Sequence, residues 1–105
     1  MKEYKDILVK SFLSMLRYLL HRGKYYSVNY INKIVKEIYQ AISMLKIFPY
    51  ATPSIKFKNK PGEYRKYVIN NRFLIIFKIE QNNVYLLYFV DARMQYENYF
   101  KIHVD

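Results

Sequence analysis

The sequence of 105 residues contains no cysteine and no tryptophan, and it has only two glycines, three prolines and two histidines. The missing cysteine excludes disulfides, thiolate zinc sites and thiol nucleophiles, and it suits a reducing compartment, so we expect a cytoplasmic protein. Two separate glycines cannot form a glycine-rich phosphate loop. Only eight acidic residues are present, which argues against a two-metal nuclease. We therefore expect neither a metal nor another cofactor.

Long apolar runs are also missing. Charged residues at positions 2, 3, 5 and 6 interrupt the first segment, so the sequence predicts no secretory signal. No apolar stretch approaches the roughly 18 residues that identify a membrane-spanning helix. The sequence therefore predicts no membrane span.

Positive charge and tyrosine are abundant instead. Eighteen lysines and arginines give a formal net charge of +10, and there are 13 tyrosines. A charge of this size favours an anionic partner, such as nucleic acid, an acidic protein or a membrane surface, although it can also serve solubility alone. Hydrophobic residues make up 52% of the chain, which is typical of a globular protein, and we expect one domain over 1–105.

The apolar periodicity predicts an α+β domain in the order β-α-α-β-β-β with a short C-terminal helix. We expect an N-terminal helical hairpin packed on a small, mainly antiparallel sheet. Ser11 and Ser27 are placed to cap the two helices, and Asn70 and Asn71 to form a turn, because asparagine tolerates positive φ. The expected strands are 4–9, 64–69, 73–79 and 84–90. The expected helices run from Ser11 to Gly23 and from Ser27 to before Pro49, and helical turns are expected at 93–100. The region 47–62 is expected to be a loop with a brief extended segment at 55–58.

The last two strands are apolar on both faces. Phe73, Phe77 and Ile79 alternate with Leu74 and Ile76, a pattern typical of strands in the middle of a covered sheet. The helical hairpin can cover one face. The other face needs the C-terminal segment, a partner chain or a ligand.

Half of the net charge falls within 17 residues. Between positions 56 and 72, six cations face one carboxylate, Glu63, which leaves +5. Aromatic residues are interleaved with them, so the segment suits a phosphate backbone with bases to stack on; the alternative is a solvated basic loop with core tyrosines. The cations are Lys56, Lys58, Lys60, Arg65, Lys66 and Arg72, and the aromatic residues are Phe57, Tyr64, Tyr67 and, further along, Tyr96.

Conventional catalytic motifs are absent, and His21 and His103 stand in no recognisable pattern. If the protein cuts a substrate, the chemistry must work without metal or histidine. RNA permits this because its 2′-OH is a nucleophile next to the scissile phosphate. Arginine and lysine can then stabilise the developing charge, and tyrosine or lysine can assist proton transfer.

The order of these elements resembles the RelE/ParE superfamily of type II toxin–antitoxin toxins. The resemblance covers nearly the whole chain and is strongest over IKFKNKPGEYRKYVINNRFLIIFKIEQNNVYLLYFVDARMQYENYF. It implies a compact α+β toxin that an acidic antitoxin neutralises. RelE-like members cleave mRNA in the ribosomal A site without metal, whereas ParE-like members poison DNA gyrase.

The resemblance also implies roles for individual residues. Lys56 and Lys58 match the basic pair of the family's loop, and Arg65 matches the basic position of the first hairpin strand. Arg93 and Tyr96 match the Arg and Tyr of a G-R-x-x-Y-like element that ends the family's pattern. It follows that Arg65, Arg93 and Tyr96 are the expected catalytic residues, and that Lys56, Lys58, Lys60, Lys66 and Arg72 are the expected RNA-binding residues.

One departure from the family leaves three hypotheses open. Active RelE-like nucleases carry Y-R-x-x-Y where this chain reads Phe73-Leu74-Ile75-Ile76-Phe77, and Ala92 replaces the closing glycine. Arg72 can replace the missing arginine only if the turn brings it inward. The chain is thus expected to be an mRNA interferase on the ribosome, a ParE-like gyrase inhibitor, or a relative without activity. We expect no membrane partner in any case.

Overall fold

The computed structural model describes residues 3–21, 26–57, 60–93 and 102–104, and in them the chain forms two α-helices and a six-stranded sheet. The expected α+β class is therefore confirmed. The strand order is β1-β5-β4-β3-β2-β6, with β1 parallel to β5 and the other pairs antiparallel. The elements are β1 (Lys5–Leu8), α1 (Lys10–Leu20), α2 (Val28–Leu45), the 3₁₀ turn η1 (Pro49–Ala51), β2 (Ser54–Phe57), β3 (Lys60–Ile69), β4 (Phe73–Glu80), β5 (Asn83–Asp91) and β6 (Ile102–Val104).

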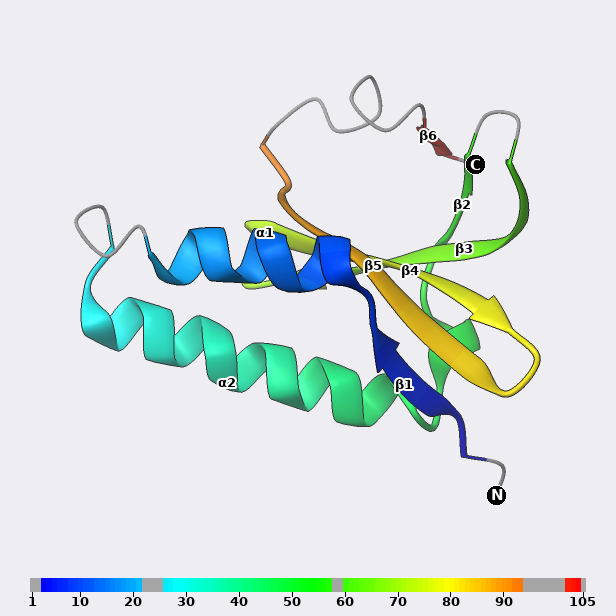
Figure 1. The fold of residues 1–105 in the computed structure, drawn as a ribbon, viewed down its shortest axis with the longest axis horizontal. Helices are drawn as coiled ribbons and strands as arrows, with labels where there is room; N and C mark the ends of the chain where they lie inside the picture. The colour runs from blue at the N-terminus through cyan, green and yellow to red at the C-terminus, as the bar shows by residue number, and fades with distance from the viewer. Residues whose placement is uncertain (1–2, 22–25, 58–59, 94–101, 105) are drawn as a thin grey trace.

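Both helices lie on one side of the sheet, as Figure 1 shows. Helix α2 buries Ile34, Ile38, Ala41 and Leu45, whose spacing of three and four residues places them on one stripe. Ser27 caps this helix as expected, since its hydroxyl accepts a hydrogen bond from the Tyr30 amide at 3.0 Å. Neither described helix is long and apolar enough to cross a membrane.

The first helix differs from expectation at its start. It begins at Lys10, so Ser11 lies inside the first turn and does not act as the cap. The Ser11 hydroxyl instead donates to the Leu87 carbonyl at 2.6 Å. Gly23, the expected end of this helix, lies outside the described residues.

A β-bulge in β5 explains this contact. Ile76 pairs with Tyr88 and Phe77 pairs with Leu86, so Leu87 has no partner on β4. The outer edge of β5 is covered here by α1, because Ser11 takes the Leu87 carbonyl and the Met15 sulfur lies 3.4 Å from the Phe89 amide. The edge of β5 is thus paired with β1 along its first half and contacted by α1 beyond the end of β1.

The tight turns follow the prediction. Asn70 and Asn71 have φ of 54° and 53° between β3 and β4. Gln81 has φ of 56° between β4 and β5. The left-handed conformation at Asn70 and Asn71 is the one that asparagine tolerates best among residues with a side chain.

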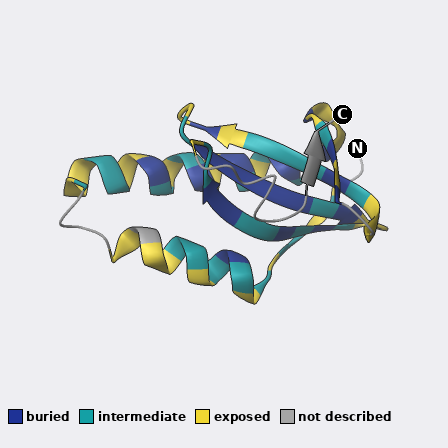
Figure 2. Cartoon of the chain, turned by 90° about the horizontal axis from the view of Figure 1, so that it is seen from above, coloured by how far each residue is buried: buried dark blue, intermediate teal, exposed yellow. Residues whose placement is uncertain are grey.

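Two hydrophobic clusters lie on the two faces of the sheet. The first packs the helices against the sheet and includes Ile75 and Phe77, both fully buried. The second lies on the face away from the helices, which we call the outer face. The ends of β2 and β3 rise on that side (Figure 1), and the central strands are buried (Figure 2). Its buried members are Ile55, Phe57, Tyr64, Leu74, Ile76 and Val90.

Strand β2 therefore contributes side chains that cover part of the second apolar face of the sheet. Ile55 and Phe57 pack with Tyr64, whereas Lys56 between them is exposed. This alternation matches the extended segment expected at 55–58. The pairing of β6 with β2 was not expected, and the helical turns expected at 93–100 lie almost wholly outside the described residues.

Candidate nucleic-acid interface

The strand register places a mixed row of tyrosine and lysine across the outer face. Tyr64 on β3 pairs with Lys78 on β4, and Lys78 pairs with Tyr85 on β5. Residues that pair directly project on the same face of a sheet. A second row places Lys66 and Tyr88 on either side of the buried Ile76. Two cations and three tyrosines thus share one face, and we call these five residues the lysine–tyrosine rows.

A hollow of about 590 Å³ lies at the tip of the β2–β3 hairpin. It is lined by Lys56, Phe57, Lys60, Pro61 and Gly62. The Lys60 ammonium lies 5.9 Å from the centre of the Phe57 ring. Two of the predicted RNA-binding lysines therefore border one concave surface, while Lys58 lies outside the described residues.

The hollow and the first row are joined by two aromatic rings. Phe57 and Tyr64 have ring centroids 4.4 Å apart, and the Lys78 ammonium lies 5.7 Å from the Tyr64 centroid. Both rings are 7% exposed. They are core residues that support cations, so neither is open for base stacking as the sequence had suggested.

Arg65 occupies a different place. It pairs with Phe77, whose side chain belongs to the cluster under the helices, so Arg65 projects toward the helical face and not the outer one. Its Nε donates to Glu63 at 2.8 Å, and its Nη1 donates to the carbonyls of Thr52 and Tyr50, the latter at 3.0 Å. The guanidinium also lies 5.0 Å from the Tyr50 ring centre. Arg65 thus clamps the segment around η1 onto β3.

Arg72 is held at the opposite end of the sheet by the start of α2. Its guanidinium lies 5.0 Å from the ring of Tyr26 and 5.8 Å from that of Tyr30, and Nη2 donates to the Tyr26 hydroxyl at 3.0 Å. Its Nε lies 3.8 Å from Asp91. Arg72 is therefore turned toward α2 and does not stand in for the arginine that Leu74 replaces.

Arg93 shares Asp91 with Arg72. Two nitrogens of Arg93 donate to the two Asp91 oxygens at 2.8 and 3.1 Å. The side-chain hydrogen bond from Arg93 holds the pKa of Asp91 below its usual range, and the same bond raises the pKa of Arg93. Arg93 remains 66% exposed, so a ligand can still reach it.

The structure does not bring Arg65 and Arg93 together. Arg65 pairs with Phe77, whereas Asp91 pairs with Phe73, four residues earlier on β4. At about 3.3 Å per residue the two positions are separated by roughly 13 Å along the strand. The two arginines also pair with different carboxylates, Arg65 with Glu63 and Arg93 with Asp91. Tyr96, the third expected catalytic residue, lies outside the described residues.

Sequence reasoning missed Lys78, Tyr85 and Tyr88. A usable signal was present at Lys78, which is the one cation in the apolar stretch FLIIFKIE. The tyrosines were harder to place, because the bulge at Leu87 changes which β5 side chains share a face.

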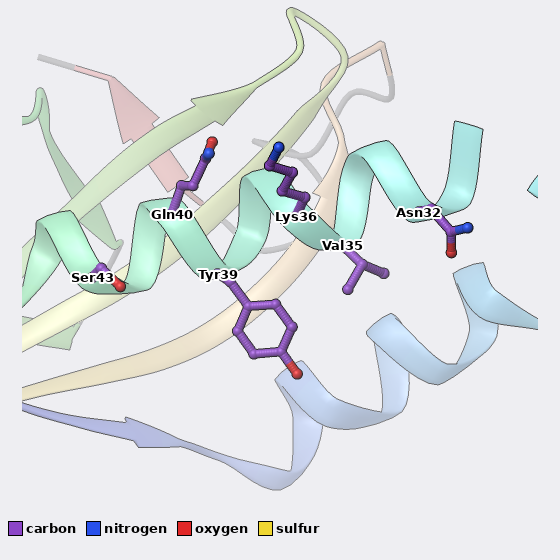
Figure 3. Close-up of a pocket in the computed structure, with 6 residues that line it drawn as sticks. All are labelled: Asn32, Val35, Lys36, Tyr39, Gln40 and Ser43. Atoms are coloured by element: carbon purple, nitrogen blue, oxygen red, sulfur yellow. The ribbon is translucent and has the colours of Figure 1, made fainter. Parts of the chain in front are cut away.

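A second hollow, of about 580 Å³, lies on the exposed side of α2 and is shown in Figure 3. Val35 and Tyr39 point toward the side where α1 lies, and Lys36 and Gln40 point the other way. The lining includes one lysine and no carboxylate. It offers a contact surface, and nothing in it resembles a reaction centre. The lining residues are Asn32, Val35, Lys36, Tyr39, Gln40 and Ser43.

Comparison with known proteins adds no assignment. No protein-family model matches the chain, and no curated protein matches its sequence. In the part of the chain that the structure describes, no three His, Asp or Glu side chains are grouped so as to hold a metal ion.

Proposed function

We propose that the protein is a RelE/ParE-like toxin that binds RNA on the outer face of its sheet and cleaves mRNA on the ribosome, and that an acidic antitoxin neutralises it. The observation that supports this most directly is the pair of lysine–tyrosine rows beside the hollow at Lys56 and Lys60. Lysines neutralise phosphates, and the partly exposed rings of Tyr85 and Tyr88 can stack on unpaired bases, whereas the buried Tyr64 supports Lys78. The order of helical hairpin and antiparallel strands is also the one that the resemblance implies.

In this proposal the RNA supplies its own nucleophile. Lysines of the outer face hold the backbone. Arg93 is bonded to Asp91, which pairs with Phe73 on the helical face, so the exposed Arg93 stabilises the charge that grows on the scissile phosphate only if the RNA passes around the end of β5. Arg65 has a positioning role, because Glu63 and two carbonyls already occupy its donors. Its contribution to activity is to hold the segment that leads into β2.

The engagement of Arg65 favours a second candidate function. A toxin that acts by binding needs no converging cations, and a ParE-like gyrase inhibitor is such a protein. The Phe73–Phe77 stretch in place of Y-R-x-x-Y points the same way.

One experiment separates the two. Purified protein is added to ribosomes programmed with a defined mRNA, and cleavage is mapped by primer extension; in parallel, gyrase is assayed for supercoiling of relaxed plasmid. We expect cleavage in the first assay and unchanged supercoiling in the second. Intact mRNA together with blocked supercoiling would replace the proposal with the second candidate, and no effect in either assay would leave a relative without activity.

A further inference from the structure

Lys78 is an unusual residue for its position. Strand β4 is buried at six of its eight positions, and Lys78 is the one cation within it, with 27% of its side chain exposed. Its Nζ lies 3.4 Å from Glu80, itself 56% exposed. A pair this exposed contributes little to stability. The contact accounts for how the lysine is tolerated there, but not for why a cation is present.

Gly62 leaves room for this lysine. Its φ is +143°, and a Cβ atom at this residue would lie 3.0 Å from Lys78 Cε and 3.1 Å from Tyr64 Cε2. Contacts this short are tighter than most real Cβ contacts, so another residue at 62 would shift the flexible end of Lys78 by a few tenths of an ångström, and it would also strain a backbone conformation that residues with a side chain rarely adopt. The backbone of β3 is thus shaped to let Lys78 lie across the tyrosine ring.

Lys78 also has a neighbouring cation in a similar setting. Lys60 lies over Phe57 as Lys78 lies over Tyr64, and the two rings are in contact. Two ammonium groups therefore flank one aromatic pair beside the hollow at the hairpin tip. On the other side of Lys78 is Tyr85, which is only partly buried.

We propose that Lys78 is the central phosphate-binding residue of the outer face, that Lys60 contacts a neighbouring phosphate of the same single strand, and that Tyr85 contacts an adjacent base. This inference rests on the proposed function in taking RNA as the polyanion. It adds a residue that the family resemblance did not supply, and it assigns to Gly62 the role of positioning Lys78.

The test measures binding of a fluorescein-labelled 12-nucleotide RNA by anisotropy at several salt concentrations. Lys78→Ala is compared with Lys36→Ala, which removes the same charge from the exposed side of α2 (Figure 3). We expect Lys78→Ala to weaken binding about tenfold and to lower the salt slope by about 0.7, the value for one phosphate on single-stranded nucleic acid. Lys36→Ala should change binding by less than about twofold, because it lies outside the proposed contact.

Gly62→Ala gives a second, independent measurement. It should weaken binding more in wild type than in a Lys78→Ala background, because the added Cβ displaces Lys78 only in wild type, whereas the backbone strain at φ +143° is the same in both. Lys78→Arg should recover part of the affinity, and circular dichroism checks that each variant is folded. Should Lys78→Ala misfold, Lys78→Gln keeps most of the stem and takes its place.

Several outcomes would overturn the inference: equal binding by the Lys78→Ala and Lys36→Ala variants, full additivity of Gly62→Ala, no RNA binding by wild type, or an acidic peptide bound with the same dependence on Lys78. Failure of the proposed function looks different. Lys78-dependent RNA binding without ribosomal cleavage would refute the interferase and leave this inference intact. Ribosomal cleavage that Lys78→Ala does not affect would refute this inference and leave the interferase intact.

Discussion

Asp6→Asn should stabilise the protein, and the gain should depend on pH. Asp6 lies on β1 opposite Val84, so its side chain is on the helical face near the end of α2. Both carboxylate oxygens are buried, and neither accepts a hydrogen bond from any residue that the structure describes. Burial raises the pKa of Asp6 from 3.8 to about 6, against attraction from Lys46, and Glu3 raises it slightly further. The ionised form is therefore disfavoured in the folded state.

The magnitude follows from the pKa difference. A rise of about two pKa units corresponds to at most about 3 kcal/mol at 1.36 kcal/mol per unit. Asp6 is only partly buried on an edge strand, so solvent screening reduces this to about 1–2 kcal/mol. Because the folded-state pKa is the higher one, the contribution of Asp6 to wild-type stability falls as pH rises from 3.8 to about 6 and is constant above that range. Asparagine resembles the protonated carboxyl and does not titrate.

Thermal melts followed by circular dichroism at pH 4, 5.5 and 7.5 test this directly. Asp6→Asn should raise Tm by about 4–8 °C per kcal/mol at pH 7.5 and by almost nothing at pH 4. Glu80→Gln is the matched control, since it removes the same charge from a residue that is 56% exposed. A gain of equal size at pH 4 and pH 7.5, or no gain at pH 7.5, would show that the Asp6 carboxylate is not disfavoured in the folded protein.

The remaining predictions concern the core and the two arginines. Ile38→Asp should unfold the domain, because it places an unpaired charge at a 4% exposed position at a cost of several kcal/mol. Lys36→Asp, on the exposed face of α2, should change stability by less than about 0.5 kcal/mol. Similar melting temperatures for the two variants would contradict the observed orientation of the helix. Arg65→Ala should destabilise the fold by about 1–3 kcal/mol, because it releases the segment around η1. Arg93→Ala should lower Tm only slightly, because its pair with Asp91 is largely exposed, and under the proposed function it should reduce mRNA cleavage. The reverse pattern would restore Arg65 as a catalytic candidate. Asp91→Asn should lower the free energy of unfolding at pH 7. The difference between variant and wild type should vanish as pH falls through the lowered pKa of Asp91, and urea titrations at pH 7 and at acidic pH would measure it.

Local patterns in the sequence were enough to predict the helices and turns. The stripe from Ile34 to Leu45 identifies the buried side of α2, and Asn70 and Asn71 mark the turn, because each depends on residues close in the chain. The predicted cap of α1 was wrong by two residues, since the helix begins at Lys10 and Ser11 bonds instead to a carbonyl 76 positions away. The bulge at Leu87 and the β2–β6 pairing also depend on distant contacts, which periodicity alone does not reveal.

The candidate site shows the same limit more sharply. The segment 56–72 was treated as one basic patch because its cations are close in sequence, but successive side chains of a strand point to opposite faces. Arg65 therefore lies under η1 with Glu63, while its neighbour Lys66 lies on the outer face. Lys78 joins that face from another strand, through a register that no count of local charge contains. Charge density in the sequence therefore predicted an anionic partner, and strand pairing was needed to identify which cations can contact it.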